Sequence, residues 1–305
     1  MIGTERIGGA PISWGVCEVP GWGVMLSSDR VLAEMRSVGI TATELGAPGF
    51  LPRSPALLVE TLARHDMTFI GGFVPVVAHD RSSRDETLAE ARDTAALFAD
   101  AGGTMFVSAV VVDAGWSAPI ELSDAEWDHL IGMLGELDDL CADHGLTHVL
   151  HPHVGTLVET AADITTVLER CDVGWCLDTG HLLIGGYDPV AFAADAGARV
   201  GHVHLKDVRA GVADELHAGR RNLLQATGDG LFCPLGVGDA PIAATVALLE
   251  SSGYQGWYVL EQDTDLGTEA PAPGTGPIDS VRVSVDYLRS VTAEPPSGSP
   301  GLENS

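Results

Sequence analysis

Basic residues are scarce in this 305-residue chain, in which 16 Lys and Arg stand against 43 Asp and Glu, for a formal net charge of -27. Nucleic acid phosphates and anionic membrane surfaces are bound by clustered Lys and Arg, so this balance argues against both as partners. The same charge favours solubility. It does not indicate a metal site by itself, because most of these carboxylates are expected on solvated helix faces.

The chain also lacks a paired-cysteine motif, a long apolar run and a recognisable leader. The five cysteines are scattered: Cys17, Cys141, Cys171, Cys176 and Cys233. Their odd number and the absence of CxxC argue against a disulfide framework and fit a reducing compartment. We interpret Cys17 and Cys176 as buried fillers, since no basic partner lies near them in sequence. No apolar stretch reaches about 18 residues, and the first residues lack a basic segment followed by an apolar one, so we expect a cytoplasmic protein.

Short apolar runs alternate with amphipathic segments of helical length along most of the chain. The runs predict eight strands: Ile7–Trp14, Ala42–Leu45, Thr68–Val74, Thr104–Ser108, Thr147–His151, Gly174–Asp178, Val200–Leu205 and Gly256–Glu261. Helices are predicted at Asp29–Val38, Pro55–His65, Ser82–Ala101, Ser123–His144, Ala161–Arg170, Asp188–Ala196, Pro241–Ser252 and Pro277–Leu288. Such alternation predicts an α/β fold, and eight repeats with continuously apolar strands favour a single closed (β/α)8 TIM barrel. A doubly wound open sheet is the alternative, but no GxGxxG follows the first strand.

Two segments do not follow the alternation of strands and helices. The connection from Asp207 to Asp239, after the seventh strand, is long and rich in Gly and polar residues, which is typical of a lid or binding loop. The end of the chain (AEPPSGSPGLENS) is rich in Pro, Ser and Gly. We therefore assign residues 1–290 to one barrel domain and 291–305 to a disordered tail.

Four consecutive predicted strands end in His, Asp or Glu. These residues are His151 and His153, Asp178 and His181, the run His202, His204, Lys206 and Asp207, and finally Glu261 and Asp263. Active sites of TIM barrels lie at the carboxyl ends of the strands, and residues two apart in a strand share a face. Mixed imidazole and carboxylate ligands suit Mn, Fe, Co or Zn better than Ca. The pattern predicts a divalent-metal site, although a single His at a strand end is more often only a polar residue, and Asp178 could simply cap a helix.

The motifs DTGH at 178–181 and HVHLKD at 202–207, with Glu261 after an aromatic-rich strand, resemble the xylose-isomerase-like TIM barrels, the sugar phosphate isomerase/epimerase superfamily. The resemblance runs to about residue 290. Four stretches are most similar to the inosose (2-keto-myo-inositol) dehydratases within it: ISWGVCEVPGWG at 12–23, TELG at 43–46, HPHVGTLVE at 151–159 and GYQGWYVLEQD at 253–263.

This resemblance implies one divalent metal, with Mn or Co favoured over Fe or Zn. The superfamily ligands are Glu, Asp, His and Glu, and the last three match Asp178, His204 and Glu261. The first position is His151 here, a departure shared with the dehydratase subgroup, and His153 is the alternative. The resemblance also implies that the polyol is bound by Trp14, Glu44, His153, His181 and Lys206. From the residues alone, Glu44 could instead cap a loop, Trp14 could belong to the core, and Lys206 could pair with Asp207 or Glu261.

The chemistry expected of such a site begins with a metal that polarises a substrate ketone, so that the α-proton leaves and an enediolate forms. The acid–base candidates are His153, His181, Glu159, Lys206 and Glu261. Protonation of a departing β-hydroxyl makes the enzyme a lyase of inositol catabolism, whereas return of the proton to carbon makes it an isomerase or epimerase of carbohydrate metabolism. Superfamily epimerases use two carboxylates, and the second is missing at His151, so we favour dehydration of a keto-polyol, with epimerisation as the alternative.

Two other classes stay open at this stage. The same barrel hosts metal-dependent endonucleases that act at abasic sites, but the charge of -27 argues against DNA as a partner. A non-catalytic sugar-binding barrel is the remaining alternative. A small polyol or keto-sugar is thus the expected ligand, and the sequence leaves a homo-oligomer possible.

Overall fold

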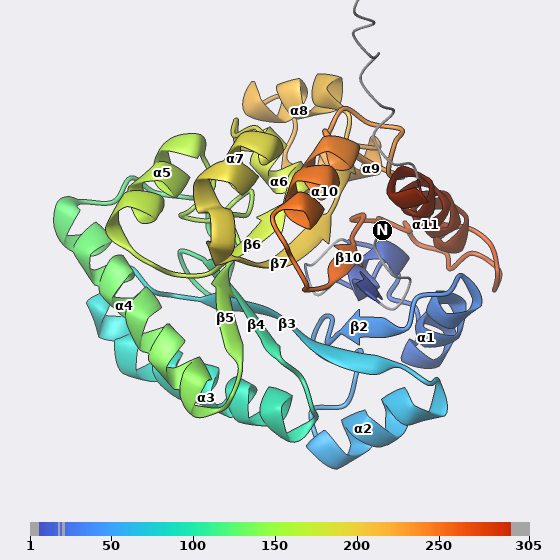
Figure 1. The fold of residues 1–305 in the computed structure, drawn as a ribbon, viewed down its shortest axis with the longest axis horizontal. Coiled ribbons are helices and arrows are strands. Elements are labelled where there is room, and N and C mark those ends of the chain that lie inside the picture. Colours follow the sequence, from blue (N-terminus) through green and yellow to red (C-terminus); the bar gives the residue numbers. More distant parts are fainter. Residues whose placement is uncertain (1–5, 18, 20–21, 294–305) are drawn as a thin grey trace, which may run out of the picture.

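Eight parallel strands close into a barrel in the computed structural model, which describes residues 6–17, 19 and 22–293 (Figure 1). Around the barrel the strand order is β1-β10-β7-β6-β5-β4-β3-β2. The bounds are β1 Ile7–Gly9, β2 Ala42–Glu44, β3 Thr68–Val76, β4 Met105–Val110, β5 Thr147–Leu150, β6 Trp175–Asp178, β7 Val200–Leu205 and β10 Tyr258–Leu260. The predicted single (β/α)8 barrel is confirmed.

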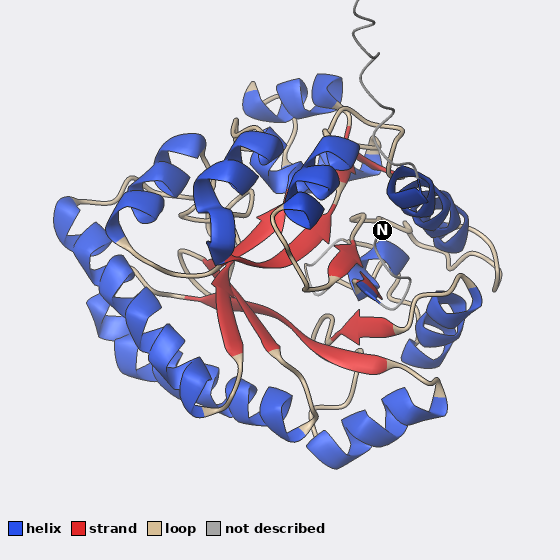
Figure 2. Ribbon diagram, in the orientation of Figure 1, coloured by secondary structure: helices blue, strands red, loops and turns tan. Residues whose placement is uncertain are grey.

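Helices surround the strands on the outside of the barrel (Figure 2). They are α1 Ser28–Ser37, α2 Pro55–Arg64, α3 Arg84–Asp100, α4 Asp124–Asp143, α5 Ala161–Arg170, α6 Thr179–Ile184, α7 Pro189–Ala196, α10 Ile242–Ser251 and α11 Pro277–Ala293, with short 3-10 turns η2 Pro11–Trp14, η3 Arg81–Ser83 and η4 Gly197–Arg199. Ser123 and Glu126 form the capping box that starts α4. Helix α11 enters the first residues assigned to the tail, and residues 294–305 lie outside the described part. None of the described helices combines the length and apolar character needed to span a membrane.

The long connection after β7 has secondary structure of its own. It contains β8 Asp207–Val208, α8 Ala210–His217, α9 Leu223–Gly228 and β9 Phe232–Cys233, with β8 antiparallel to β9. Asp207 ties this segment together, because its carboxylate accepts the backbone N–H groups of Gly236, Gly238 and Ala240. The connection is therefore a packed cap beside the strand ends rather than an irregular loop.

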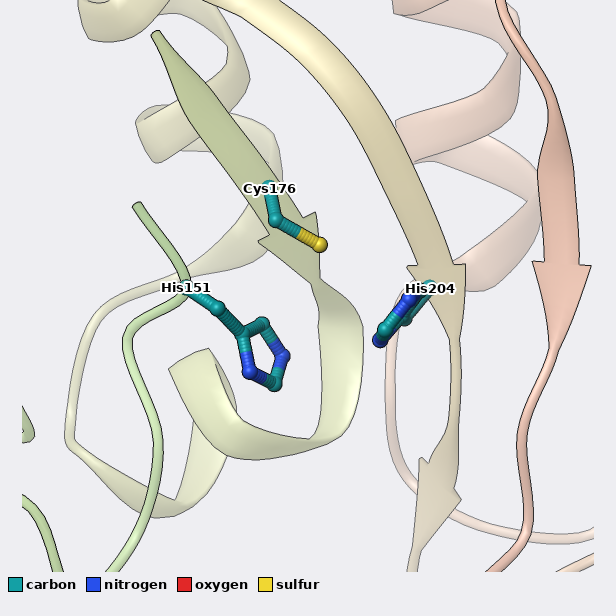
Figure 3. Close-up of side chains that lie close together, drawn as sticks. All are labelled: His151, Cys176 and His204. Atoms are coloured by element: carbon teal, nitrogen blue, oxygen red, sulfur yellow. The ribbon is translucent and has the colours of Figure 1, made fainter. Parts of the chain in front are cut away.

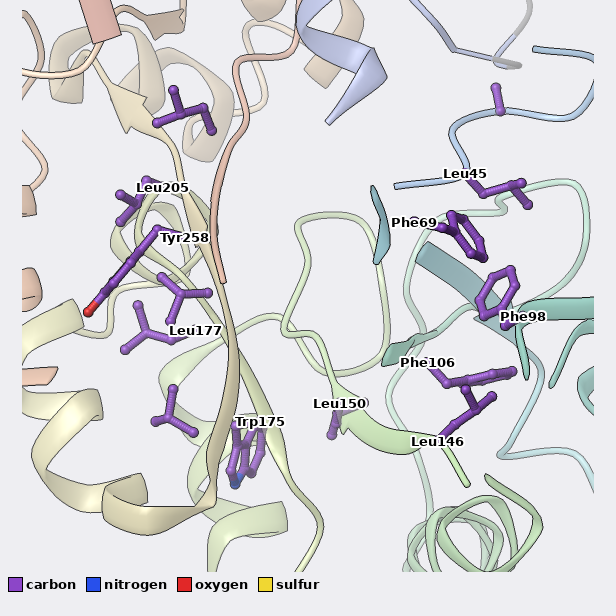
Figure 4. Packing of buried hydrophobic residues seen from close by; sticks show 14 of the residues in the cluster. Leu45, Phe69, Phe98, Phe106, Leu146, Leu150, Trp175, Leu177, Leu205 and Tyr258 are labelled. Atoms are coloured by element: carbon purple, nitrogen blue, oxygen red, sulfur yellow. The ribbon is translucent and has the colours of Figure 1, made fainter. Parts of the chain in front are cut away.

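Two hydrophobic regions flank the strands. Large side chains such as Leu45, Phe69, Phe98, Trp175 and Tyr258 fill the layer between strands and helices (Figure 4). The barrel interior holds a smaller cluster: Ala10, Ala42, Ile70, Met105, Val107, Val149, Cys176 and Val259. This inner cluster fills the barrel interior. The polar residues come after it along the strands and therefore lie at the carboxyl ends.

The first strand is shorter than predicted. It ends at Gly9, and Pro11–Trp14 form the 3-10 turn η2, which ends at Gly15 with a left-handed φ of 76°. Proline at the first position of the turn and glycine at its end explain the break, because proline cannot donate to a strand ladder and glycine adopts positive φ without strain. Trp14 consequently lies beyond the strand instead of at its tip.

Candidate metal centre

The four predicted metal ligands face one another at the ends of neighbouring strands. Donor atoms of Asp178, His204 and Glu261 lie within 4.8 Å of one another, and all three residues are buried or nearly so. His204 Nδ1 is 2.9 Å from Glu261 Oε2 and 3.8 Å from Asp178 Oδ2. His151 joins the group, since its Nε2 is 3.4 Å from Asp178 Oδ2. One predicted ligand thus comes from the end of each of four consecutive barrel strands, β5, β6, β7 and β10.

Asp178 has two roles that the sequence presented as alternatives. Its Oδ1 accepts the backbone N–H groups of Gly180 and His181, both at 2.8 Å, and so caps α6. Its Oδ2 faces His151 and Lys206 instead. Gly180 is required beside it, because a Cβ there would lie 2.7 Å from Lys206 Cγ. The helix cap fixes the carboxylate and leaves its second oxygen free to bind a cation.

Lys206 is the one lysine among the 305 residues, and it is fully buried in this cluster. Its Nζ lies 2.7 Å from Glu261 Oε1, 2.8 Å from Asp263 Oδ1 and 2.9 Å from His181 Nε2. Of the two pairings left open by the sequence, Lys206 makes the one with Glu261, while Asp207 binds backbone amides. Asp263 is a member of the cluster that the predicted set of site residues lacked.

The charges of Lys206 and the neighbouring carboxylates stabilise one another in this group of side chains. Burial alone would lower the pKa of Lys206, but the carboxylates of Asp263 and Glu261 raise it above its ordinary value, so the side chain is an ammonium ion. Burial would raise the pKa of Glu261, but the charges of Lys206 and His204 hold it well below its usual range. At Asp263 the effect of burial is larger than that of the Lys206 charge, so the pKa of this carboxyl rises to about 6.

Three imidazoles in the site are neutral. Burial lowers the pKa of His153 to about 3, with His151 and Lys206 adding to the shift, and it also lowers the pKa values of His151 and His181. The rings of His153 and His181 lie 3.8 Å apart between centroids. His153 Nδ1 is 2.7 Å from the carbonyl oxygen of Val154, which places its proton there and leaves Nε2 as an acceptor. These rings are suited to binding a metal or hydroxyl groups rather than to carrying charge.

Glu44 lies beneath the predicted ligands. Its Oε1 is 2.9 Å from His202 Nε2 and 3.0 Å from His204 Nε2, and its side chain is buried. The register of β2 against β3 shifts between Thr43 and Glu44, opposite Gly71 at φ 135°, and this bulge sets the direction of the carboxylate. This contact gives Glu44 an orienting role, because Glu44 holds the Nε2 proton of His204 and leaves Nδ1 to face the other predicted ligands. Its predicted contact with substrate hydroxyls stays a prediction.

We expect Glu44→Gln to reduce stability in a pH-dependent manner. Burial alone would raise the pKa of Glu44, but His204 and His202 lower it to about 2. A depressed carboxyl pKa contributes stability above the unfolded value near 4.5 and loses it as the pH falls toward 2, so the variant should be less stable by about 3 kcal/mol at pH 7. Urea unfolding of metal-free protein between pH 7 and 3 measures this difference. Glu60→Gln, at an exposed position, is the control, and an equal deficit at both ends of the pH range would refute the account.

Two predicted site residues lie apart from the cluster. The Trp14 side chain is fully buried in the outer core, and its Nε1 donates to Glu34 Oε2 at 2.8 Å, so it presents no face to a substrate. Glu159 is half-buried in the segment after β5, where its carboxylate accepts the backbone N–H of Gly155 at 2.8 Å. Its described contacts connect it to its own loop and not to the metal ligands.

An aromatic wall does border the site, but it comes from other strands. Phe73 of β3 and Trp116 after β4 are stacked, with centroids 6.0 Å apart and an interplanar angle of 14°. Their rings lie 5.6 and 5.9 Å from that of His153. Both are partly exposed, unlike Trp14. Neither residue was among the predicted site residues. Trp116 shortly follows the end of β4, which was an available signal, whereas Phe73 lies within β3 and resembles a core residue in the sequence.

The donors that this structure brings together fit a divalent cation. Two carboxylates and two imidazoles provide the mixed oxygen and nitrogen set that first-row metals prefer. Among the described residues, His204 Nδ1 is a buried nitrogen that lacks a well-aligned hydrogen bond, and it faces the carboxylates of Asp178 and Glu261. The geometry favours His151 over His153 as the fourth ligand, because His151 is the one whose donor atom lies next to those of Asp178 and His181.

The fold and these motifs define a protein class. The sequence profile of the xylose isomerase-like TIM barrel family matches residues 32–291, and the chain belongs to this family. Among curated proteins, it is similar to the inosose dehydratase of Geobacillus kaustophilus (strain HTA426), with 34% identity over 281 residues, or 87% of this chain and 90% of the relative. The predicted resemblance is confirmed at both levels.

Solved structures show the same fold at low sequence identity. An L-ribulose 3-epimerase superposes with a TM-score of 0.68 at 18% identity, covering 94% of both chains. The probable 3-DHS dehydratase of Bacillus anthracis involved in petrobactin synthesis superposes with a TM-score of 0.69 at 15% identity, covering 93% of this chain and 98% of its own. Both dehydratases and epimerases thus occur on this barrel, so the reaction must be argued from the site.

Proposed function

We propose that this protein is a divalent-metal-dependent hydro-lyase that dehydrates a keto-polyol of the 2-keto-myo-inositol class. The observation that carries the proposal is the convergence of His151, Asp178, His204 and Glu261 in one buried cluster beside a lysine ammonium. The 34% identity to an inosose dehydratase over most of the chain supports the substrate class. Mn²⁺ or Co²⁺ is the favoured cation, because the set mixes imidazole with carboxylate and contains no more than two carboxylates.

Different residues of the cluster are proposed to bind the substrate and to transfer protons. A bound divalent cation would act as a Lewis acid on the substrate carbonyl. Glu261 is the proposed acceptor of the α-proton. The Lys206 ammonium and Asp263 lie beside it and would stabilise and protonate the departing β-hydroxyl. His153 and His181, both neutral, are proposed to hold hydroxyl groups of the polyol. The proton taken up by Glu261 balances the one given to the departing hydroxyl, so the net change is loss of one water, and the product is the enol of a 1,2-diketone.

Dehydration is favoured over epimerisation by the residue at the first ligand position. Epimerisation of a carbon next to a ketone requires a base on each face of the substrate. Here Glu261 supplies one carboxylate, whereas the opposite position is occupied by His151, whose pKa is lowered by burial. Asp263 does not replace the missing base, because it lies on the Lys206 side with Glu261. The arrangement therefore supports loss of a hydroxyl group rather than return of a proton.

The test is incubation of metal-free protein, reconstituted with Mn²⁺ or Co²⁺, with 2-keto-myo-inositol. We expect ultraviolet absorbance from the conjugated product, together with its dehydrated mass. Ketohexoses should be tested in parallel by chromatography, because epimerised ketose without any dehydrated product would support the alternative function. Neither product with either metal would refute both.

Replacing Trp116 with alanine should weaken substrate binding more than catalysis. The stacked pair of Trp116 and Phe73 would cover one face of a ring-shaped polyol, and loss of one aromatic contact of this kind costs about 1 kcal/mol or more. We expect KM to rise about tenfold with little change in kcat. Trp127→Ala, in α4 outside the barrel, is the matched control, and an unchanged KM for the Trp116 variant would remove this residue from the binding surface.

A further inference from the structure

A thiol lies one layer below the metal ligands. Cys176 precedes Asp178 by two residues on β6, so its side chain also points into the barrel, and it belongs to the inner hydrophobic cluster. Donor atoms of His151, Cys176 and His204 lie within 4.8 Å of one another, and all three residues are buried. Figure 3 shows the three side chains directed into the same space from separate segments, with the sulfur turned toward the imidazoles.

This trio differs chemically from the set that contains the carboxylates. One thiol and two imidazoles are the donors that thiophilic cations such as Zn²⁺ and Cd²⁺ prefer, whereas Asp178 and Glu261 are hard oxygen donors. A second observation points to a ligand: His204 Nδ1 is a buried nitrogen that lacks a well-aligned hydrogen bond among the described residues. The proposed reaction has no role for the Cys176 thiol, so the position is not explained by that chemistry.

We propose that His151, Cys176 and His204 form an alternative site for a thiophilic divalent cation. Binding there breaks the S–H bond, releases one proton to solvent and forms a sulfur–metal bond, with no change of oxidation state. Because His151 and His204 belong to both sets, occupancy of this site excludes a cation held by Asp178, His204 and Glu261. A soft cation would thereby be trapped below the catalytic position, and the protein would discriminate between metals by the depth at which each one binds.

The site itself does not depend on the proposed function, and only the competition between the two sites does. An experiment can therefore refute the cation site without refuting the proposed function, and the reverse. A protein that dehydrates no polyol could still bind Cd²⁺ through sulfur, and an active dehydratase could bind Cd²⁺ without using Cys176.

The experiment is a titration of the metal-free protein with Cd²⁺, followed by the ultraviolet charge-transfer absorbance of a thiolate–metal bond. Cys176→Ser is the test variant, and Cys141→Ser is the matched control, because Cys141 is equally buried but lies in α4 outside the barrel. We expect a band with one equivalent of Cd²⁺ in the wild type and the control, and no band in Cys176→Ser. The dissociation constant for Cd²⁺ should rise at least about tenfold in Cys176→Ser.

Mn²⁺ binding, followed by electron paramagnetic resonance, distinguishes a specific effect from misfolding. In the wild type, one equivalent of Cd²⁺ should release bound Mn²⁺, whereas Cys176→Ser should still bind Mn²⁺ and retain it at the same Cd²⁺ concentration. A wild-type protein that binds Cd²⁺ without the charge-transfer band would overturn the proposal. A band of equal strength in Cys176→Ser would overturn it as well, since another cysteine would then be the ligand.

Discussion

Replacing Asp178 with asparagine should abolish tight binding of a divalent cation and lower turnover by at least about a thousandfold. The substitution removes one of two anionic donors from the set, while Oδ2 of this residue is also the oxygen that lies nearest His151 and Lys206. Lewis-acid stabilisation of several kcal/mol corresponds to a rate factor of this size. Calorimetric titration with Mn²⁺ and the dehydration assay measure the two effects independently.

The fold should survive this substitution, because asparagine can still cap α6. Its side-chain carbonyl can accept the N–H groups that Asp178 now binds at Gly180 and His181. Asp188→Asn is the matched control: Asp188 caps α7 in the same manner, through Val190 and Ala191, at an exposed position. Without metal, Asp188→Asn should melt near the wild-type temperature, whereas Asp178→Asn should melt lower but still cooperatively, because it loses the charge that lies beside Lys206. If Asp178→Asn bound Mn²⁺ as tightly as Asp188→Asn, the assigned metal centre would be wrong.

The placement of the ligands could be predicted because it depends on short-range rules. A strand alternates its faces every two residues, and parallel barrel strands end at one rim, so HVH and a terminal Glu suffice to bring His204 and Glu261 together. In the barrel, Asp178 indeed lies opposite His204 in the ladder between β6 and β7. The eight strands were recognisable for the same reason, since continuous apolar runs are typical of sheets buried on both faces.

The residues around the ligands could not be placed in this way, because their positions depend on irregular local geometry. The direction of Glu44 results from a bulge beside Gly71, which no hydrophobic pattern reveals. Trp14 was assigned to the wrong place because the first strand stops five residues earlier, at a 3-10 turn that begins with Pro11. Pro11 marks this end of the strand in the sequence, because proline cannot donate to a strand ladder, whereas the apolar run continues past it.

The pairing of Lys206 with Asp263 could not be predicted from the sequence, for a different reason. Lys206 is the single lysine of the sequence and lies within the HVHLKD motif, which indicates that its side chain belongs to the site. Its partner could not be chosen from the sequence, because Asp207 is adjacent in the chain while Asp263 is reached only when β10 closes beside β7. The predicted barrel order places these two strand ends side by side, but it does not specify which of the carboxylates there the Lys206 side chain reaches.

Replacing Lys206 with methionine should destabilise the metal-free protein by about 3–5 kcal/mol at pH 7, because three buried carboxylates would lose their cation. The ammonium lies 2.7 Å from Glu261, 2.8 Å from Asp263 and 3.7 Å from Asp178, and it is fully buried. Methionine fills a similar volume but carries no charge. Urea unfolding measures the loss, and Arg282→Met, which breaks the exposed ion pair with Asp279, should have only a small effect.

Added Mn²⁺ should restore part of the stability of Lys206→Met, since a dication would replace positive charge beside Asp178 and Glu261. The same variant should regain stability as the pH is lowered toward 5. Asp263, whose pKa is already raised to about 6 by burial, would then be protonated and would need no counter-ion. A deficit that is the same at pH 5 and pH 8, with or without metal, would show that Lys206 acts through packing alone.

The single lysine also permits a direct test of its burial in the wild type. Reductive dimethylation modifies amines, and the ε-amine of Lys206 is the one lysine amine in the sequence. Peptide mass analysis should find Lys206 unmodified in the folded protein and dimethylated in the urea-unfolded protein, because its amine is enclosed by Glu261, Asp263 and His181. Rapid labelling of Lys206 in the folded protein would mean that solvent reaches Nζ, and the stability argument for its charge would then fail, since exposed ion pairs contribute little.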